Sequence, residues 1–295
     1  MSAVAITQKW DSRQHMLSDN YEIFHYKDSY LKDVALHHHD FYEIYCFISG
    51  DVSYNIESRN YDLQPGDILL ISPQELHQPI IEQKKPYERI VLWINCNFLK
   101  KLSSEKSDLT RCFDTGGKDR TNLLRLDPED LRAVRAYFVD LLAETNNPKE
   151  YGDLICRSLL VRLVAELNRH FCGYTGHFET DTSLGGVMND IVNYINKHHT
   201  RNLSLDFLSQ EFYISKYHMS REFMRHFGIS IHRYITKKRL ITAKQLLSEG
   251  ITPSEVCTMC GFSDYANFYR AFRSEYGISP REFAEYIRVR DNTTF

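Results

Sequence analysis

The stretch Ile251–Tyr286 reads ITPSEVCTMCGFSDYANFYRAFRSEYGISPREFAEY and carries start and stop signals for three short helices. Thr252 and Ser279 each precede a proline and stand three residues before a glutamate, which is the arrangement of a capping box. Gly261 and Gly277 follow the first two of these helices, at the position where a left-handed residue commonly ends a helix. We therefore expect three helices separated by tight glycine turns.

The middle helix of this stretch has an apolar and a polar face. Ser263 stands where it can cap the helix, and Phe268 and Phe272 then share one face. The opposite face carries Ala266, Arg270 and Arg273. Two helices joined by a glycine turn, the second with a basic outer face, are typical of a helix-turn-helix that binds DNA.

These residues resemble the signature of the AraC family of bacterial transcription regulators. The family pattern runs from a GFSD motif, through an aromatic-rich helix that ends in Phe-Lys or Phe-Arg, to the motif FGxSP. The matching segments here are Cys260–Asp264, Phe272-Arg273 and Tyr276–Pro280. The resemblance implies a transcription regulator that binds specific double-stranded DNA through two helix-turn-helix motifs. It also implies activation with RNA polymerase as partner, often at genes of carbohydrate use.

A second helix-turn-helix is expected upstream. The sequence predicts helices at 187–199, at 205–211 after Ser204, and at 216–227 after Ser215, the last with a buried stripe of Met219, Phe223 and Phe227. By position, the resemblance assigns DNA contacts to Tyr217, Ser220, Arg221 and Arg225 in the first recognition helix and to Tyr265, Ala266, Asn267, Arg270 and Arg273 in the second. Arginine favours guanine edges and asparagine favours adenine. The alternative for each residue is a solvated or phosphate-binding side chain.

One long helix, Ile231–Glu249, is expected to join the two motifs, with Ser230 as its cap and Gly250 at its end. Nineteen residues span about 28 Å, which approaches the ~34 Å repeat of B-DNA. The two recognition helices could thus enter successive major grooves. The basic run Lys237-Lys238-Arg239 on this helix either contacts phosphate or is solvated.

The length of the chain and the distribution of its charge both predict two domains. Its 295 residues predict two domains, which we place at 1–172 and 187–290, with a Gly/Thr/Asp-rich linker at 173–186. The net charge of −3 combines +4 from Gly185 onward with −7 before it, so nucleic acid is the expected partner of the C-terminal part. No run is apolar enough to span a bilayer and no leader is visible, which predicts a cytoplasmic protein without a membrane partner.

The seven scattered cysteines are typical of buried thiols in a reducing compartment. Cys257 and Cys260 form a CxxC spacing. Because no second Cys or His pair accompanies them, we favour core packing over a zinc or redox site.

Residues 21 to about 96 alternate between short β-branched or aromatic runs and turn signals. The runs at 21–26, 41–48, 52–57, 68–71 and 89–95 predict a sandwich or small barrel. The segment from His37 to Gly50 and the segment from Gly66 to His77 have the histidine, glutamate and glycine spacing that resembles the cupin fold, although Glu75 stands where that pattern usually has glycine. The fold class is therefore α+β with two domains: a cupin-like β-barrel or jelly roll followed by its own helices, then an all-α domain.

His37, His39 and Glu43 share odd parity, so a continuous strand would place all three on one face, with His77 opposite on a second strand. Three interpretations remain open. The four residues could bind a divalent metal. They could line an effector pocket beside Trp93 or a tyrosine and bind a hydroxyl-rich ligand, which is what the resemblance supports for a sugar-like effector. They could also be surface residues of no special role.

Two helices are predicted after the strands. Asp127 and Pro128 begin one that ends near 145, and a second covers 152–171 with a stripe of Cys156, Leu160, Leu163 and Leu167. This stripe either packs against the barrel or forms the homodimer interface that the family places in such helices.

The sequence favours a regulator without enzymatic activity or a required cofactor, because no nucleophile stands beside a base in a recognisable motif. Two alternatives stay open. One is a metal-dependent cupin enzyme with an accessory DNA-binding domain, and the other is a ligand-independent regulator whose barrel serves only for dimerisation.

Overall fold

The computed structural model describes residues 15–292 apart from 32–33, 83–84, 115–120 and 174–185. The chain divides into two compact units, an N-terminal unit of residues 1–183 and a C-terminal unit of residues 184–295. Most of the proposed linker, 173–186, lies outside the described residues. Gly173 ends the last helix before it and Gly186 begins the next.

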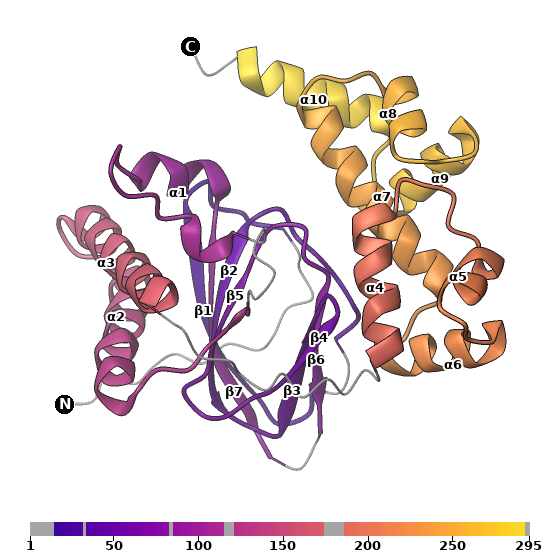
Figure 1. Ribbon diagram of the computed structural model, residues 1–295. Coiled ribbons are helices and arrows are strands. Elements are labelled where there is room, and N and C mark those ends of the chain that lie inside the picture. The colour runs from indigo at the N-terminus through magenta and orange to yellow at the C-terminus, as the bar shows by residue number, and fades with distance from the viewer. Residues whose placement is uncertain (1–14, 32–33, 83–84, 115–120, 174–185, 293–295) are drawn as a thin grey trace. The chain divides into compact units, whose positions relative to one another are not determined.

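The N-terminal unit contains a five-stranded and a three-stranded sheet, which face each other (Figure 1). The order in the larger sheet is β1-β7-β2-β5-β8 and in the smaller sheet β4-β3-β6. The strands are β1 (Tyr21–Asp28), β2 (Tyr42–Ser49), β3 (Val52–Ile56), β4 (Arg59–Asp62), β5 (Ile68–Ile71), β6 (His77–Ile81), β7 (Tyr87–Ile94) and β8 (Leu123–Leu124). The sequence predicts five of these strands from their runs, whereas β4, β6 and the two-residue β8 show no such run, although the cupin-like spacing places His77 on a further strand.

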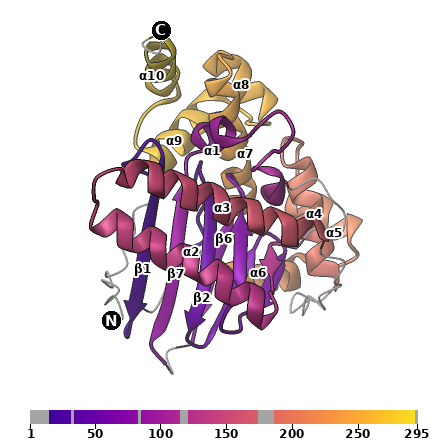
Figure 2. The same ribbon diagram turned by 90° about the vertical axis from the view of Figure 1, so that its left-hand side faces the viewer.

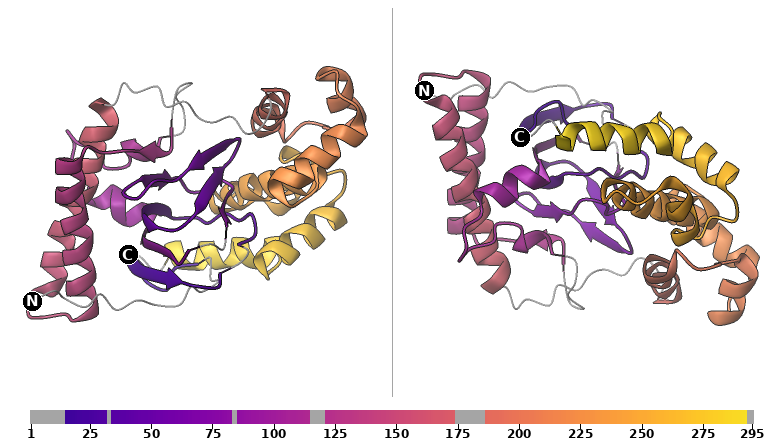
Figure 3. Two further views of the ribbon diagram at one scale, coloured as in Figure 1. Left: turned by 90° about the horizontal axis from the view of Figure 1, so that it is seen from below. Right: turned by 90° about the horizontal axis from the view of Figure 1, so that it is seen from above.

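Helices cover the outer face of the larger sheet. α2 (Pro128–Asn146), capped by Asp127 as expected, and α3 (Gly152–Gly173) lie side by side across β1, β7 and β2 (Figures 2 and 3). Two short helices, α1 (Cys96–Leu102) and the 3-10 helix η1 (Arg111–Phe113), precede them and are not predicted from the sequence. Alternate residues of the strands, such as Ile44 and Leu92, pack with α2 and α3 in one core.

The leucine stripe of α3 belongs to this core. Leu160, Leu163 and Leu167 are fully buried within the unit, and Cys156 is buried beside them. The interpretation of this stripe as a dimer interface is therefore wrong, and its alternative, packing against the barrel, is correct. The sheet and α2 already occupy the face that a second copy would need.

The C-terminal unit consists of helices in its described residues. They are α4 (Gly186–His198), α5 (Leu205–Glu211), α6 (Lys216–Phe227), α7 (Ile231–Ser248), α8 (Pro253–Met259), α9 (Tyr265–Tyr276) and α10 (Pro280–Asn292). The helices α5 and α6 form one helix-turn-helix, and α8 and α9 form the other. The helix α7 contacts α4 and α6 as well as α8, α9 and α10, so it joins the two motifs (Figure 1). The predicted fold class, a cupin-like domain followed by an all-α domain, is confirmed.

Local capping explains most of these helix starts. Ser204, Ser215 and Ser230 cap their helices, and Thr252 with Glu255 forms the expected capping box. The cap of α9 differs from the prediction, because Asp264 and not Ser263 accepts the backbone N–H of Asn267, at 2.7 Å. A carboxylate at a helix N-terminus also interacts favourably with the helix dipole. That backbone hydrogen bond lowers the pKa of Asp264.

Two basic residues predicted to be phosphate contacts or solvated are structural instead. Lys237 is buried and pairs with Glu275 of α9. Arg239 donates to the backbone carbonyls of His199 and Arg201, at 2.7 and 2.8 Å. Both side chains hold α7 against neighbouring segments, so their positive charges are engaged within the protein and not available for phosphate contacts.

Candidate functional site

The pairing of β2 with β7 builds the floor of a site between the two sheets. Glu43 lies opposite Trp93 in the register, and Tyr45 lies opposite Val91. Because side chains alternate along a strand, these residues face the smaller sheet while their neighbours face the helices. The Trp93 Nε1–H donates to Glu43 Oε2 at 2.8 Å, so the cross-strand pair is joined by a buried hydrogen bond.

Three histidines approach Glu43 from outside β2. That strand begins at Tyr42, close to the predicted start at 41, so His37 and His39 precede it and the condition of a continuous strand through all three residues is not met. The backbone of His37 instead bridges His77, the first residue of β6, through two hydrogen bonds of 3.1 and 2.9 Å. The predicted residues nevertheless converge, because this bridge turns the segment inward.

Distances confirm how closely the cluster is packed. The ring centroid of His77 lies 4.3 Å from that of His37 and 4.8 Å from that of His39. His39 Nε2 is 3.3 Å from Glu43 Oε2. His39, Glu43 and His77 are all buried, whereas His37 is half-buried.

The orientation of the three imidazoles is fixed by the backbone. The Nδ1 atom of His37 lies 2.9 Å from the carbonyl oxygen of Ala35, and that of His39 lies 2.9 Å from the carbonyl oxygen of Phe41. The Nδ1 atom of His77 lies 2.8 Å from the carbonyl oxygen of Glu75. Because a carbonyl can only accept, Nδ1 carries the proton in each neutral ring. Each Nε2 then presents a lone pair.

Electrostatics separates the protonation states within the cluster. Burial and the neighbouring imidazoles of His37 and His39 lower the pKa of His77 well below its ordinary value, so this ring is neutral. Burial alone would raise the pKa of Glu43, but the nearby imidazoles of His39 and His37 and the hydrogen bond from Trp93 lower it overall. A buried carboxylate therefore faces imidazoles, at least one of them neutral.

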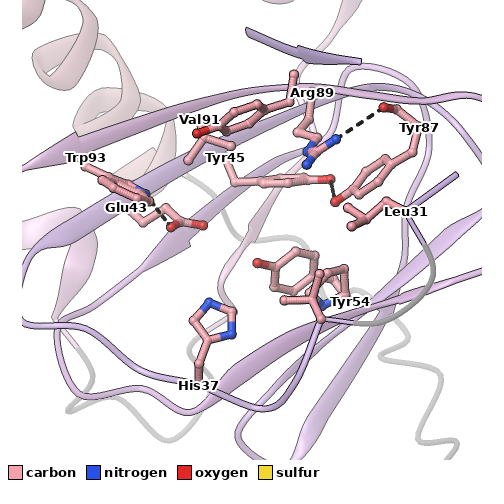
Figure 4. Close-up of a pocket in the computed structure, with 12 residues that line it drawn as sticks. Leu31, His37, Glu43, Tyr45, Tyr54, Tyr87, Arg89, Val91 and Trp93 are labelled. Atoms are coloured by element: carbon pink, nitrogen blue, oxygen red, sulfur yellow. Dashed lines mark hydrogen bonds between the residues drawn. The ribbon is translucent and has the colours of Figure 1, made fainter. Parts of the chain in front are cut away.

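A cavity opens beside this cluster. The empty space measures about 500 Å³, part of it open to solvent, and polar groups of His37, Glu43, Tyr54 and Arg89 lie around it (Figure 4). Its lining residues are Tyr26, Leu31, Val34, His37, Glu43, Tyr45, Tyr54, Pro79, Tyr87, Arg89, Val91 and Trp93. Of the five residues assigned to an effector pocket, His37, Glu43 and Trp93 line the cavity, while His39 and His77 lie behind that lining.

The tyrosines and Arg89 are not identified from the sequence. Tyr45 and Tyr87 share a hydrogen bond of 2.6 Å between their hydroxyls. The guanidinium of Arg89 lies over the rings of Tyr87 and Tyr26, at 4.1 and 4.8 Å, and pairs with Asp28. The odd parity shared by 87, 89, 91 and 93 is the signal that could have found Tyr87 and Arg89.

The DNA contacts assigned to α6 lie on its exposed face. Met219, Phe223 and Phe227 are buried on the opposite face, as predicted. Tyr217 is 77% exposed, and the guanidinium of Arg221 lies 5.9 Å from its ring centre. The remaining assigned residues are Ser220, which is half-buried, and Arg225, whose guanidinium donates to Glu222 at 2.6 Å.

The residues assigned to α9 are also exposed. Tyr265, Ala266, Asn267, Arg270 and Arg273 all lie away from the buried Phe268 and Phe272. Asn267 connects two of its neighbours, because its amide N–H donates to Asp264 and its oxygen accepts from Arg270 at 2.5 Å. These contacts hold one polar face in a fixed arrangement on the second helix of the motif.

Comparison with known proteins places one family match in each of the two units. A model of the AraC-like ligand binding domain matches residues 20–164, and a model of a helix-turn-helix domain matches residues 208–286. Cys257 and Cys260, within the second match, are buried in the hydrophobic core, as the sequence predicts. No helix in the described part of the chain is both long and apolar enough to cross a membrane.

Individual relatives extend over different shares of the chain. The activator RhaS of Escherichia fergusonii is 23% identical over 258 residues, which cover 84% of this chain and 87% of RhaS. The probable regulator LumQ of Photobacterium leiognathi is 38% identical over 99 residues, which cover 33% of this chain and only 40% of LumQ. The structure of ToxT from Vibrio cholerae covers 91% of this chain and 98% of that one, with 17% identity and a TM-score of 0.35. The two domain matches together show that the chain belongs to the AraC family and is a transcriptional regulator with a ligand-binding domain and a helix-turn-helix DNA-binding domain.

Proposed function

We propose that this regulator activates transcription at specific double-stranded DNA sites when a small hydroxyl-rich molecule, such as a sugar, occupies the N-terminal cavity. The observation that carries the proposal is the lining of that cavity, which combines aromatic faces with hydroxyl, carboxylate and guanidinium groups. Rings can pack against the C–H faces of a sugar, while the polar groups bind its hydroxyls. The cavity thus has a binding role, and we assign no catalytic residue.

Arg89 and Glu43 define the polarity of this pocket. Arg89 is buried and already paired with Asp28, and Glu43 already accepts from Trp93. Because both charges are partly compensated, a neutral ligand with several hydroxyls suits the pocket better than a strongly charged one.

The test is a thermal-shift screen of the full-length protein against a sugar library, followed by calorimetry on any compound that raises the melting temperature. Glu43→Gln and His37→Ala should each weaken binding of that compound by roughly tenfold or more, because a hydrogen bond to a charged group contributes about 1.5–3 kcal/mol. His38→Ala is the matched control, since His38 does not line the cavity. Unchanged affinity in both pocket variants would refute the proposed site.

We further propose a homodimer formed through the outer face of α2 and α3. Val139, Leu154 and Ile155 are 49%, 56% and 43% exposed, and Tyr151 next to them in the chain is also exposed. Exposed apolar side chains on the two helices and the loop between them favour an interaction surface on this side of the unit. Light scattering of the full-length protein tests this assignment.

Activation requires RNA polymerase as a partner. In transcription by purified polymerase from a target promoter, the protein should raise transcript yield when the effector is added. A fall in yield would make it a repressor, and an equal yield with and without effector would support a ligand-independent regulator.

A further inference from the structure

Two nitrogens in the cluster behind the cavity have no hydrogen-bond partner. They are His39 Nε2 and His77 Nε2, and among the described side chains they belong to a small set of fully buried polar atoms left without one. Buried polar groups in native proteins are nearly always satisfied. Because Nδ1 of each ring is already bonded to a carbonyl, the unpartnered atom is in both cases the one that carries the lone pair.

These lone pairs lie around a shared point with Glu43. One ligand atom from each of His39, Glu43 and His77 lies within 4.8 Å of the other two. All three side chains are buried, so the site is removed from bulk water. Two imidazole nitrogens and one carboxylate are a common set of three protein ligands, which leaves further coordination positions open.

The surroundings have the form expected around a metal centre. Ligating histidines usually donate their second ring N–H to a carbonyl or carboxylate, and ligating carboxylates are themselves hydrogen-bonded. His39 and His77 meet the first condition through Phe41 and Glu75, and Glu43 meets the second through Trp93. The orienting contacts are therefore in place before any ion binds.

We propose that His39, Glu43 and His77 bind one divalent transition-metal ion at the wall of the cavity. The nitrogen-rich set favours ions such as Zn²⁺, Co²⁺, Ni²⁺ or Fe²⁺ over Mg²⁺ and Ca²⁺, which prefer oxygen ligands. Glu43 also lines the cavity, so the ion would lie next to any molecule bound there. The proposal does not rest on the sugar-like effector and stands if no sugar binds.

The test uses the full-length protein, freed of metal by a chelator and then titrated with Co²⁺. We expect ligand-field absorption that saturates at one equivalent, disappears on addition of Zn²⁺, and accompanies a higher melting temperature. Trp93→Phe removes the hydrogen bond that orients Glu43 while keeping an aromatic ring at this position, and it should weaken Co²⁺ binding by about 10–100-fold. His39→Ala, His77→Ala and Glu43→Gln remove a ligand and should weaken it further than Trp93→Phe does.

His25→Ala is the matched control. His25 is a buried histidine of the same unit whose Nε2 lies 2.9 Å from Glu88, so it reports on loss of a buried imidazole outside the cluster. This variant should bind Co²⁺ like the unchanged protein. Circular dichroism establishes the fold of each variant, and if the ligand variants fail to fold, the titration of the unchanged protein decides. Absence of Co²⁺ absorption in that protein would overturn the proposal and make buried water the partner of the two nitrogens. Equal loss in His25→Ala would also overturn it.

Discussion

Replacing Gly261 with alanine should destabilise the C-terminal unit far more than the same change at Gly277. Both glycines follow a helix of a helix-turn-helix motif, and both have φ of +77°. They differ in their surroundings. A Cβ at Gly277 would meet no atom within 4 Å, whereas a Cβ at Gly261 would lie 2.8 Å from the carbonyl carbon of Thr200 and closer still to its oxygen.

The structure gives the size of the difference. Left-handed backbone costs a residue with a Cβ about 1–2 kcal/mol, and this applies equally to both positions. At Gly261 the obstacle is backbone, which cannot rotate away, so an overpacking cost of about 1–3 kcal/mol is added. We therefore expect Gly261→Ala to lower the free energy of unfolding by about 2–5 kcal/mol and Gly277→Ala by about 1–2 kcal/mol.

Two optical probes separate the units in a urea titration. Both tryptophans, at positions 10 and 93, precede residue 184, so tryptophan fluorescence follows the N-terminal unit. Far-ultraviolet circular dichroism follows the helices, including all of α4–α10. Gly261→Ala should move the circular-dichroism transition and leave the fluorescence transition in place. Equal losses in the two variants would refute the argument from Thr200.

Three further predictions concern other parts of the chain. Leu163→Glu should unfold the N-terminal unit, because it places a charge in the buried core. Leu154→Glu changes an exposed residue, so it should leave the melting temperature unchanged and convert dimers to monomers in light scattering. Persistent dimers would place the interface elsewhere. Lys237→Ala should lower the free energy of unfolding by about 1–3 kcal/mol in urea titrations, since the largely buried ion pair with Glu275 is lost, and an unchanged value would contradict a structural role. Arg270→Ala should weaken binding to the specific DNA site by about 1–3 kcal/mol more than binding to random duplex in a fluorescence-anisotropy titration, and equal weakening would reassign Arg270 to a phosphate contact.

The helices of the C-terminal unit were predictable because their signals are local. The capping box at Thr252, the serine caps and the glycine stops all act within four residues of the helix end. The cap of α9 is Asp264 and not the predicted Ser263, because Asp264 directly precedes the helix and its carboxylate can accept a backbone N–H as a serine hydroxyl does.

The missed strands have no comparable local signal. The residues of β4 follow a turn directly, and β6 begins at His77, where pairing with β3 rather than its own alternation defines the strand. Strand pairs depend on partners far along the chain, so short strands without a clear period escape prediction.

The site was predictable only in part, for the same reason. Parity correctly singles out residues on one face of a strand, but it fails for His37 and His39 because the strand begins after them. Their convergence with His77 comes from the backbone bridge, a long-range contact. Parity within β7 connects Tyr87 and Arg89 with Trp93, but the tyrosines of other strands join them only through strand pairing, such as that of β2 with β7, which no spacing within one segment reveals.

Charge patterns are ambiguous in the same way, and α7 shows why. A run of three basic residues on a long helix beside two DNA-binding motifs suggests phosphate contact, yet Lys237 and Arg239 are bound to Glu275 and to backbone carbonyls. Because these two side chains are engaged within the protein, the exposed cations assigned to DNA are the arginines of α6 and α9. Any of these four arginines that contacts phosphate rather than a base should add close to one unit to the logarithmic salt slope of DNA binding, so replacing it with alanine should reduce that slope by about one.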